Sequence, residues 1–220
     1  MKTIAIIPAR GGSKRLPGKN IQMLDGIPLI AHSILYAKSN PQIDAVFVST
    51  DDDKISTAAT QFGATVITRP KTISGDFEPT VSALKHALLL LGDEVENVVL
   101  LQATNPLRPD MLLNEAMAIY TSLNLESLFT VSPNYRKLGK IKNDTFIPFN
   151  YKPGQRSQDL EPLYFENGLL YICKAQLILN NTIINDTSYP MPIDHIFGEV
   201  DIDTAADFEW AEYLIQKYKK

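Results

Sequence analysis

The stretch ARGGSKRLPGKN at residues 9–20 decides how the rest of the sequence is interpreted. It follows the apolar run IAII at residues 4–7, which is typical of a buried strand, and it precedes a helical pattern that starts near Pro28. The stretch holds four cations, three glycines and no acidic residue. Because glycine lets backbone N–H groups face an anion, and because Arg and Lys add positive charge, this loop predicts a polyphosphate site.

Two common phosphate-binding loops are excluded by spacing. A Walker A loop needs four residues between its glycines, whereas five separate Gly12 from Gly18, and Asn20 stands where that motif has its hydroxyl. The Gly-x-Gly of a dinucleotide-binding turn is also missing from the stretch. From the loop alone, an ordinary strand-to-helix turn with a solvated basic rim remains an open alternative.

Short β-branched runs alternate with amphipathic helical stretches along most of the chain. We expect strands at residues 4–7, 45–50, 64–68, 98–102, 128–131, 168–173 and 196–202. We expect helices at residues 29–37, 53–61, 79–91, 109–123 and 204–217. This order predicts an α/β fold of three layers, in which a mainly parallel sheet carries helices on both faces. Ligands of such sheets bind beyond the carboxyl ends of the strands, where the basic loop lies.

The alternating pattern breaks at residues 133–163, which we name the arm. Asn143-Asp144 and Pro153-Gly154 are hairpin signals, and no long helix fits in this segment. A projecting insertion of this kind cannot bury itself, so the sequence predicts that a partner subunit covers it in a homodimer. With no linker in view, residues 1–220 are expected to form a single domain.

Composition excludes several classes of protein. The net charge of −4 argues against a nucleic-acid binder, and no apolar run is long enough to span a membrane. The one cysteine, Cys173, lies in an apolar stretch, which excludes a disulfide framework and fits a cytoplasmic protein.

An acidic pair near the carboxyl terminus complements the basic loop. Asp201 and Asp203 are two residues apart in an expected strand, so their side chains leave the same face. Mg²⁺ prefers such oxygen ligands together with substrate phosphates, although acids also favour the start of the following helix for electrostatic reasons alone. Arg69 ends the third expected strand, where it reaches a phosphate or a base, or is simply an exposed turn residue.

Six motifs in order now resemble the acylneuraminate cytidylyltransferase family, the CMP-sialic acid synthetases, over nearly the whole chain. They are IPARGGSK (7–14), LPGKN (16–20), STD (49–51), LLQ to PLR (100–108), NG (167–168) and DID (201–203). The resemblance implies a Rossmann-like nucleotidyltransferase fold and a homodimer whose arm closes the partner's sugar site. It also implies Mg²⁺-dependent transfer from CTP to a nine-carbon 2-keto sugar acid, with release of pyrophosphate.

The same resemblance implies roles for individual residues. The catalytic residues are Arg10, Lys19 and Asp203. The nucleotide-binding residues are Arg10, Gly11, Gly12, Ser13, Lys19, Asn20, Arg69 and Thr80. The sugar-binding residues are Gln102, Arg156 and Tyr171, and the metal-binding residues are Asp201 and Asp203.

Three departures from the family pattern concern the sugar. Residues 103–105 read Ala-Thr-Asn where Pro-Thr-Ser is common, Glu166 precedes Asn167-Gly168, and residues 156–162 carry one residue more than many relatives have. An acid near a carboxylated sugar fits a substrate whose substituents donate hydrogen bonds, so legionaminic and pseudaminic acids stand beside sialic acid. Two alternatives remain at this point: a cytidylyltransferase for the eight-carbon acid Kdo, and a noncatalytic protein that binds nucleotide sugars.

Overall fold

The structure is a computed structural model that describes residues 2–218. Its main sheet is formed by β1 (Thr3–Pro8), β4 (Ala45–Thr50), β5 (Thr65–Thr68), β6 (Asn97–Leu100), β7 (Ser127–Asn134), β10 (Leu163–Lys174) and β11 (Tyr189–Pro192). Within the described residues the strand order is β11-β7-β10-β6-β1-β4-β5. Only β10 runs antiparallel to its neighbours, β6 and β7, so the sheet is mixed but mostly parallel.

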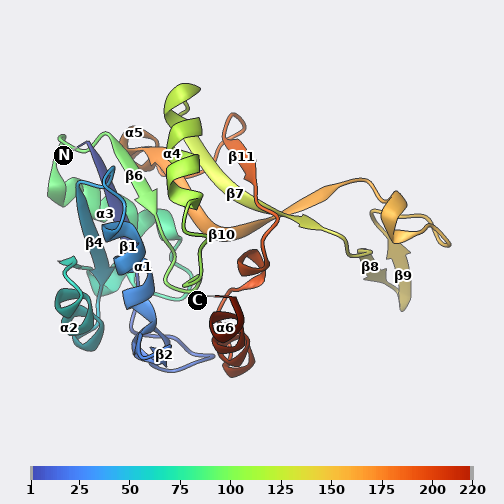
Figure 1. The fold of residues 1–220 in the computed structure, drawn as a ribbon, viewed down its shortest axis with the longest axis horizontal. Coiled ribbons are helices and arrows are strands. Elements are labelled where there is room, and N and C mark those ends of the chain that lie inside the picture. Colours follow the sequence, from blue (N-terminus) through green and yellow to red (C-terminus); the bar gives the residue numbers. More distant parts are fainter. Residues whose placement is uncertain (1, 219–220) are drawn as a thin grey trace.

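Helices cover both faces of this sheet (Figure 1). The helices are α1 (Leu29–Lys38), α2 (Asp53–Gln61), α3 (Thr80–Leu91), α4 (Leu112–Ser122), α5 (Ala175–Leu179) and α6 (Ala205–Tyr218), with short 3₁₀ turns η1 (Lys19–Ile21), η2 (Lys71–Ile73), η3 (Ser157–Asp159) and η4 (Ile196–Glu199). Alternate residues of β1 serve opposite faces: Ala5 and Ile7 pack with α1, α2 and α4, whereas Ile4 and Ile6 pack with α3 and α5. The expected three layers are therefore confirmed.

A third apolar cluster joins the carboxyl terminus to the basic loop. Leu214 of α6 packs in it with Val200, Ile202 and Leu24, the last of which belongs to β2 (Met23–Leu24), paired with β3 (Ile27–Pro28). This packing brings the segment that precedes α6 beside residues 9–20. At 14 residues α6 is the longest helix of the described chain, and none of the helices in residues 2–218 has the length and apolarity needed to cross a bilayer.

The expected strand at residues 196–202 is wrong. Residues Ile196–Glu199 form η4, and the following residues are extended without joining the sheet. Their backbone groups bond to a loop instead of to a strand, since Ile202 N donates to the Thr104 carbonyl at 2.8 Å. The alternation of buried Val200 and Ile202 with outward-facing acids made this segment resemble a strand. The sheet edge is formed by β11, which the sequence did not predict.

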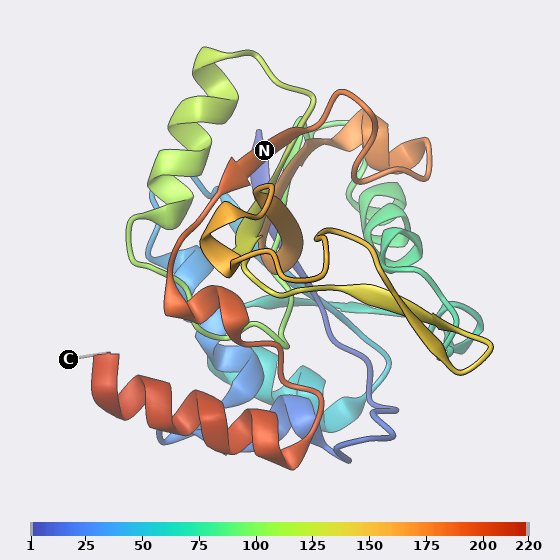
Figure 2. The same cartoon turned by 90° about the vertical axis from the view of Figure 1, so that its right-hand side faces the viewer.

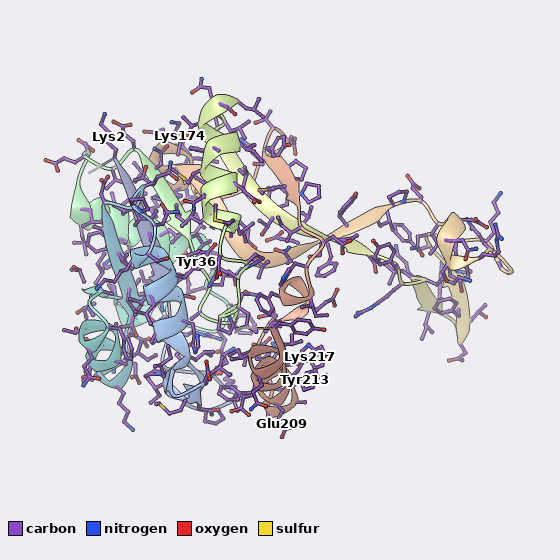
Figure 3. All side chains as sticks on the ribbon, viewed as in Figure 1. Lys2, Tyr36, Lys174, Glu209, Tyr213 and Lys217 are labelled. Atoms are coloured by element: carbon purple, nitrogen blue, oxygen red, sulfur yellow. The ribbon has the colours of Figure 1, made fainter. Side chains whose placement is uncertain are left out.

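The arm leaves the body where β7 and β10 diverge (Figure 1), and Figure 2 looks along it toward the body. Its tip is a hairpin of β8 (Gly139–Lys142) and β9 (Thr145–Pro148). Asn143 and Asp144 turn the chain with φ angles of 50° and 58°, as the hairpin signal predicted. The side chains of the hairpin stand out into solvent (Figure 3), and Ile141 is 79% exposed. The arm therefore holds apolar surface that the described chain leaves uncovered.

Candidate active site

The basic loop is held at the carboxyl ends of β1 and β4. Gly11 N donates to Asp51 Oδ1 at 3.0 Å, and a Cβ on Gly11 would lie 2.7 Å from Asp52 Oδ2, so only glycine fits against this turn. Asn20 Nδ2 donates to the Arg10 carbonyl at 3.1 Å and closes the loop on itself. The Gly11 N–H therefore ties the loop to the end of β4 and does not face an anion, whereas the glycines of the loop had led us to expect that it would.

Lys19 joins the loop to the carboxyl-terminal acids. Its side chain is buried, and its Nζ donates to Asp203 Oδ1 at 2.8 Å and to the Ile202 carbonyl at 2.6 Å. Arg15 contacts the other oxygen of the same carboxylate, with 2.7 Å between Arg15 Nη2 and Asp203 Oδ2. Residues that lie 184 positions apart in the sequence thus share one ion-pair cluster, which confirms that the loop and Asp203 meet.

The start of α6 fixes the position of Asp203. Asp207 Oδ2 accepts hydrogen bonds from the backbone N–H of Asp203 and Thr204 at 3.0 and 2.7 Å, and Asp207 N donates to Thr204 Oγ1 at 3.3 Å. These reciprocal bonds between Thr204 and Asp207 form a capping box. Because the cap bonds the backbone of Asp203 directly, the carboxylate leaves the helix start in a defined direction toward Lys19.

A cavity of about 540 Å³ opens beside this cluster. Eight of the expected site residues line it: Arg10, Ser13, Lys19, Asn20, Arg69, Thr80, Gln102 and Asp203. The cavity lies between the basic loop, the start of α3 and the carboxyl end of β6, which is where ligands bind in parallel sheets. Its size and its cationic lining fit a nucleotide.

Arg69 is the most unusual cation of this cavity. It is only 8% exposed, and its Nε and Nη2 atoms have no hydrogen-bond partner in the described chain. Burial lowers the pKa of the guanidinium, an effect that the negative charge of Asp51 opposes. A buried donor without a partner lowers the stability of the folded chain, so the Nε and Nη2 groups of Arg69 are available to donate hydrogen bonds to a ligand in the cavity.

Asp76 is a residue that the sequence analysis missed. One of its carboxylate oxygens lies 2.8 Å from Arg10 Nη1, the other contacts Lys14 Nζ, and the residue lines the same cavity. The hydrogen bond from Lys14 lowers the pKa of Asp76. One feature of the sequence could have indicated Asp76. It follows Gly75 in the connection between the expected strand at residues 64–68 and the expected helix at residues 79–91, and such connections lie at the carboxyl ends of the strands, where ligands bind.

A second, smaller cavity of about 290 Å³ adjoins the first, and Gln102 lines both. Gln102 Nε2 donates to Tyr171 Oη at 3.2 Å, and Tyr171 Oη donates to Glu166 Oε1 at 2.5 Å. Burial raises the pKa of Tyr171, and its hydrogen bond to Glu166 adds to the effect. Glu166, Glu199 and Asp201 line this cavity, which is therefore rich in hydrogen-bond acceptors.

The two acids of the DID motif face different cavities. Asp203 lines the larger cavity and Asp201 the smaller one. Partial burial raises the pKa of Asp201, and the charge of Asp203 raises it further, while a hydrogen bond from Thr104 lowers it. Two carboxylates that repel each other in this way provide oxygen ligands for a cation, although residues 2–218 contain no cluster of three or more His, Cys, Asp or Glu side chains placed to hold a metal.

Asn105 links two of the segments that form the smaller cavity. Its Nδ2 donates to the carbonyls of Asn167 and Val200 at 3.1 and 2.7 Å. Gly168 adopts φ +73°, and a Cβ there would lie 2.7 Å from Asn105 Oδ1. The glycine is therefore required both by its backbone conformation and by the close approach of Asn105.

Two expected site residues lie apart from these contacts. Gly12 stays in the loop with open space where a Cβ would stand, so nothing steric demands glycine there. Arg156 precedes η3 in the arm, where its Nε lies 2.7 Å from Asp159 Oδ2, and the arm points away from the body (Figure 1). The described chain therefore does not bring Arg156 to Gln102 and Tyr171.

Comparison with known proteins identifies relatives of this chain. The cytidylyltransferase family model matches residues 4–217. The chain is 34% identical over 230 residues to the CMP-N,N'-diacetyllegionaminic acid synthase of Legionella pneumophila, covering 98% of this chain and 97% of that protein. It is 34% identical over 216 residues to the N-acylneuraminate cytidylyltransferase of Streptococcus agalactiae, covering 94% of this chain but only 52% of that longer protein.

A solved structure shows the same fold. The CMP:2-keto-3-deoxy-manno-octonic acid synthetase complexed with CTP superposes with a TM-score of 0.74, covering 99% of both chains at 18% sequence identity. At this identity the likeness extends to the fold alone. The seven-stranded, mostly parallel sheet of the described residues is thus an arrangement already seen in a nucleotide-binding protein.

Proposed function

The chain belongs to the cytidylyltransferase family, and from that premise we propose that it activates a nine-carbon 2-keto sugar acid with CTP. The products are the CMP-sugar and pyrophosphate. Sialic, legionaminic and pseudaminic acids are the candidate substrates, because the relatives include a legionaminic acid synthase and a pseudaminic acid cytidylyltransferase of similar length, and a longer N-acylneuraminate cytidylyltransferase. A reducing cytoplasm fits the free, buried thiol of Cys173.

The observation that carries this proposal is the lining of the larger cavity. A buried Arg69 with unpaired donors faces the same space as the cations of the basic loop and the carboxylate of Asp203. Cations bind the phosphates of a nucleotide, and an acid in the same cavity binds the metal ion that accompanies them. A cavity that offered only cations would fit any polyanion, so the acid narrows the ligand to a metal-bound polyphosphate.

We assign the nucleotide to this cavity. We assign Arg10 and Lys19 to the phosphates, with Ser13 and Asn20 beside them, and Arg69 and Thr80 to the nucleoside; all six residues line the cavity. Gly11 holds the loop against the end of β4 through its bond to Asp51, and Gly12 follows it in the same turn. In this arrangement Lys19 is already oriented by Asp203, so its ammonium group needs little reorganisation when the phosphates arrive.

Magnesium fits the donor set of Asp201 and Asp203. The charge of Asp203 helps to raise the pKa of Asp201, and a hard divalent cation would relieve that repulsion with the oxygen ligands it prefers. When bound, Mg²⁺ supplies charge neutralisation at the phosphates. Asp203 is the better placed of the two for this role because it lines the nucleotide cavity, while Asp201 lines the neighbouring one.

The sugar acid belongs in the smaller cavity. Gln102 and Tyr171 position it, since Gln102 lines both cavities and is itself oriented by Tyr171. In the proposed reaction the anomeric 2-hydroxyl of the sugar attacks the α-phosphorus in line and loses its proton as pyrophosphate departs. Arg10 and Lys19 stabilise the charge that develops on the leaving group. The protein thus contributes positioning and charge rather than a covalent intermediate.

We propose a homodimer as the functional form. The hairpin and the residue that follows it expose four large apolar side chains: Ile141, Phe146, Ile147 and Phe149. An isolated two-stranded hairpin is marginally stable, and exposed apolar patches mark interaction surfaces. A partner subunit that covers the arm would also give Arg156 a sugar site to enter. Light scattering tests this: Ile141→Asp is expected to yield monomers, and Lys142→Gln on the same strand to remain dimeric.

Pyrophosphate release tests the function directly. CTP or GTP is offered with sialic, legionaminic, pseudaminic or eight-carbon sugar acids in the presence of Mg²⁺, and Lys19→Met serves as the inactive control. We expect release with CTP and one or more of the nine-carbon acids. Release with the eight-carbon acid alone would replace this proposal by a Kdo cytidylyltransferase. Nucleotide-sugar binding without any release would indicate a noncatalytic protein.

A further inference from the structure

The four cations of the basic loop are neutralised in pairs by two carboxylates of the chain itself. Asp203 contacts Arg15 and Lys19, whereas Asp76 contacts Arg10 and Lys14. Both acids line the larger cavity. The proposed function explains Asp203 as a metal ligand, but it leaves Asp76 without a task, and an acid at the phosphate-binding cations is at first sight a disadvantage for a nucleotide enzyme.

The two acids are held very differently. The backbone of Asp203 is fixed by the capping box of α6, and its partner Lys19 is only 6% exposed. Asp76 lies in the irregular segment between η2 and α3, in a turn closed by a 3.3 Å bond from Glu78 N to the Gly75 carbonyl, and its neighbour Phe77 is fully exposed. The Asp203 pair is thus part of the packed structure, whereas the Asp76 pair sits on a segment with few anchors.

We propose that Asp76 is an exchangeable counter-ion that occupies Arg10 and Lys14 until the triphosphate displaces it. A carboxylate and a phosphate accept hydrogen bonds from the same ammonium and guanidinium donors, so the nucleotide takes over contacts that Asp76 has already oriented. When pyrophosphate departs, the carboxylate returns to the cations and assists its release. Asp76 therefore sets the affinity of the loop for phosphates and is a positioning residue rather than a catalytic one.

Charge and exposure support an exchange of this kind. Lys14 is largely exposed and Arg10 partly so, and ion pairs of exposed side chains are weak enough to be broken by a competing ligand. A triphosphate carries several negative charges against the single charge of Asp76, so it displaces the carboxylate, whereas inorganic phosphate competes on nearly equal terms. The loop thereby prefers polyphosphates without needing a deeper cavity.

The inference rests on the proposed function, and direct binding separates the two. Isothermal titration of the purified protein with CTP, inorganic tripolyphosphate and pyrophosphate, in the absence of sugar acid, compares wild type with Asp76→Asn and Asp76→Ala. Both variants are expected to bind all three ligands about two- to tenfold more tightly. Asp76→Glu keeps a carboxylate within reach and is expected to return the affinity toward that of wild type.

Two further measurements complete the test. In steady-state assays the Asp76→Asn variant is expected to be inhibited by pyrophosphate at a concentration lower by a similar factor. Asp53→Asn removes one negative charge from an exposed side chain at the first turn of α2 and controls for a general change of net charge. If Asp53→Asn tightened binding as much as Asp76→Asn does, the specific contact would be refuted.

The remaining outcomes are equally decisive. Weaker binding of tripolyphosphate by both Asp76 variants would overturn the inference and make Asp76 a ligand of the metal or the nucleotide. Unchanged binding would also overturn it, because Asp76 would then have no effect on the affinity of the loop. If tripolyphosphate binding tightened while CTP failed to bind even the wild type, the counter-ion role would stand and the proposed function would fall. If none of the three ligands bound to the wild type or to any variant, the counter-ion role and the proposed function would both be refuted.

Discussion

The two adjoining cavities carry opposite charge. The larger one presents five cations, the four of the loop and Arg69, against three acids, whereas the smaller one presents Glu166, Glu199 and Asp201 and no cation. Gln102 lines both, and Asp201 and Asp203 divide between them. One continuous site is thus split into a half that attracts anions and a half that accepts hydrogen bonds from a ligand.

The difference shows how each half recognises its substrate. The larger cavity uses charge, which acts over several ångströms and is screened by salt. The smaller cavity uses the directed chain from Gln102 through Tyr171 to Glu166, which depends on geometry. Removing a charge should therefore impair nucleotide binding and turnover, while removing a hydrogen-bond acceptor should change the preference among sugars.

The largest effect is expected for Asp203→Asn. Loss of the charge that orients Lys19 and serves the metal should lower kcat by about 10²-fold or more, as removal of one major electrostatic stabiliser does in other enzymes. Pyrophosphate release at saturating Mg²⁺ measures it, and a thermal melt confirms that the variant is folded. An unchanged kcat would remove Asp203 from the catalytic machinery.

A smaller, selective effect is expected for Glu166→Gln. The amide oxygen can still accept the Tyr171 hydrogen bond, but the negative charge is gone from the smaller cavity. KM for the sugar acid should change by about three- to tenfold, which is within the range of one ordinary hydrogen bond, while KM for CTP stays within twofold. A change confined to CTP would contradict the division of the site into two halves.

Ionic strength separates the halves without any mutation. Between roughly 0.05 and 0.5 M salt, screening should raise KM for CTP several-fold, because the cations of the larger cavity act partly through solvent. KM for the sugar acid should move less. Steady-state kinetics at fixed pH measures both values, and equal shifts in the two would contradict the division of the site into two halves.

The smallest effect concerns stability and the pH. The pKa of Asp201 is raised on folding, so the native state binds this proton more tightly than the unfolded state does. Stability therefore falls as pH rises from the ordinary carboxyl pKa through the raised one, and the destabilisation is fully present at pH 7. Without metal, Asp201→Asn should raise Tm by about 1–2 °C at pH 7 and by less near pH 4, measured by calorimetry. A lower Tm at pH 7 would contradict this sign.

Local patterns predicted much of the fold. The hairpin turn at Asn143 and Asp144, the capping box of α6 and the alternation of strands with helices all depend on contacts between residues close in sequence. The strand expected at residues 196–202 failed for a related reason: its alternation of apolar and acidic residues is real, but a loop satisfies its backbone in place of a neighbouring strand. An alternating pattern of apolar and polar residues indicates which side chains are buried. It does not indicate which segment forms hydrogen bonds with the backbone.

The antiparallel direction of β10 also could not be predicted from the sequence pattern. A strand buried on both faces reads as a continuous apolar run whether it is parallel or antiparallel, and residues 168–173 carry such a run. The direction follows from the path of the chain through the arm, which sends β10 back alongside β7. No pattern within the strand records that path.

For the site, the residue types and their order along the chain were enough to expect a cationic loop, an acidic pair and a nucleotide between them. The pairing of Lys19 with Asp203, the unpaired donors of Arg69 and the contact of Asp76 with Arg10 emerged only from the folded chain. Ion pairs and buried orphan donors depend on distances of a few ångströms between segments far apart in sequence. Such distances are set by how the layers pack, which the local periodicity of a sequence does not encode.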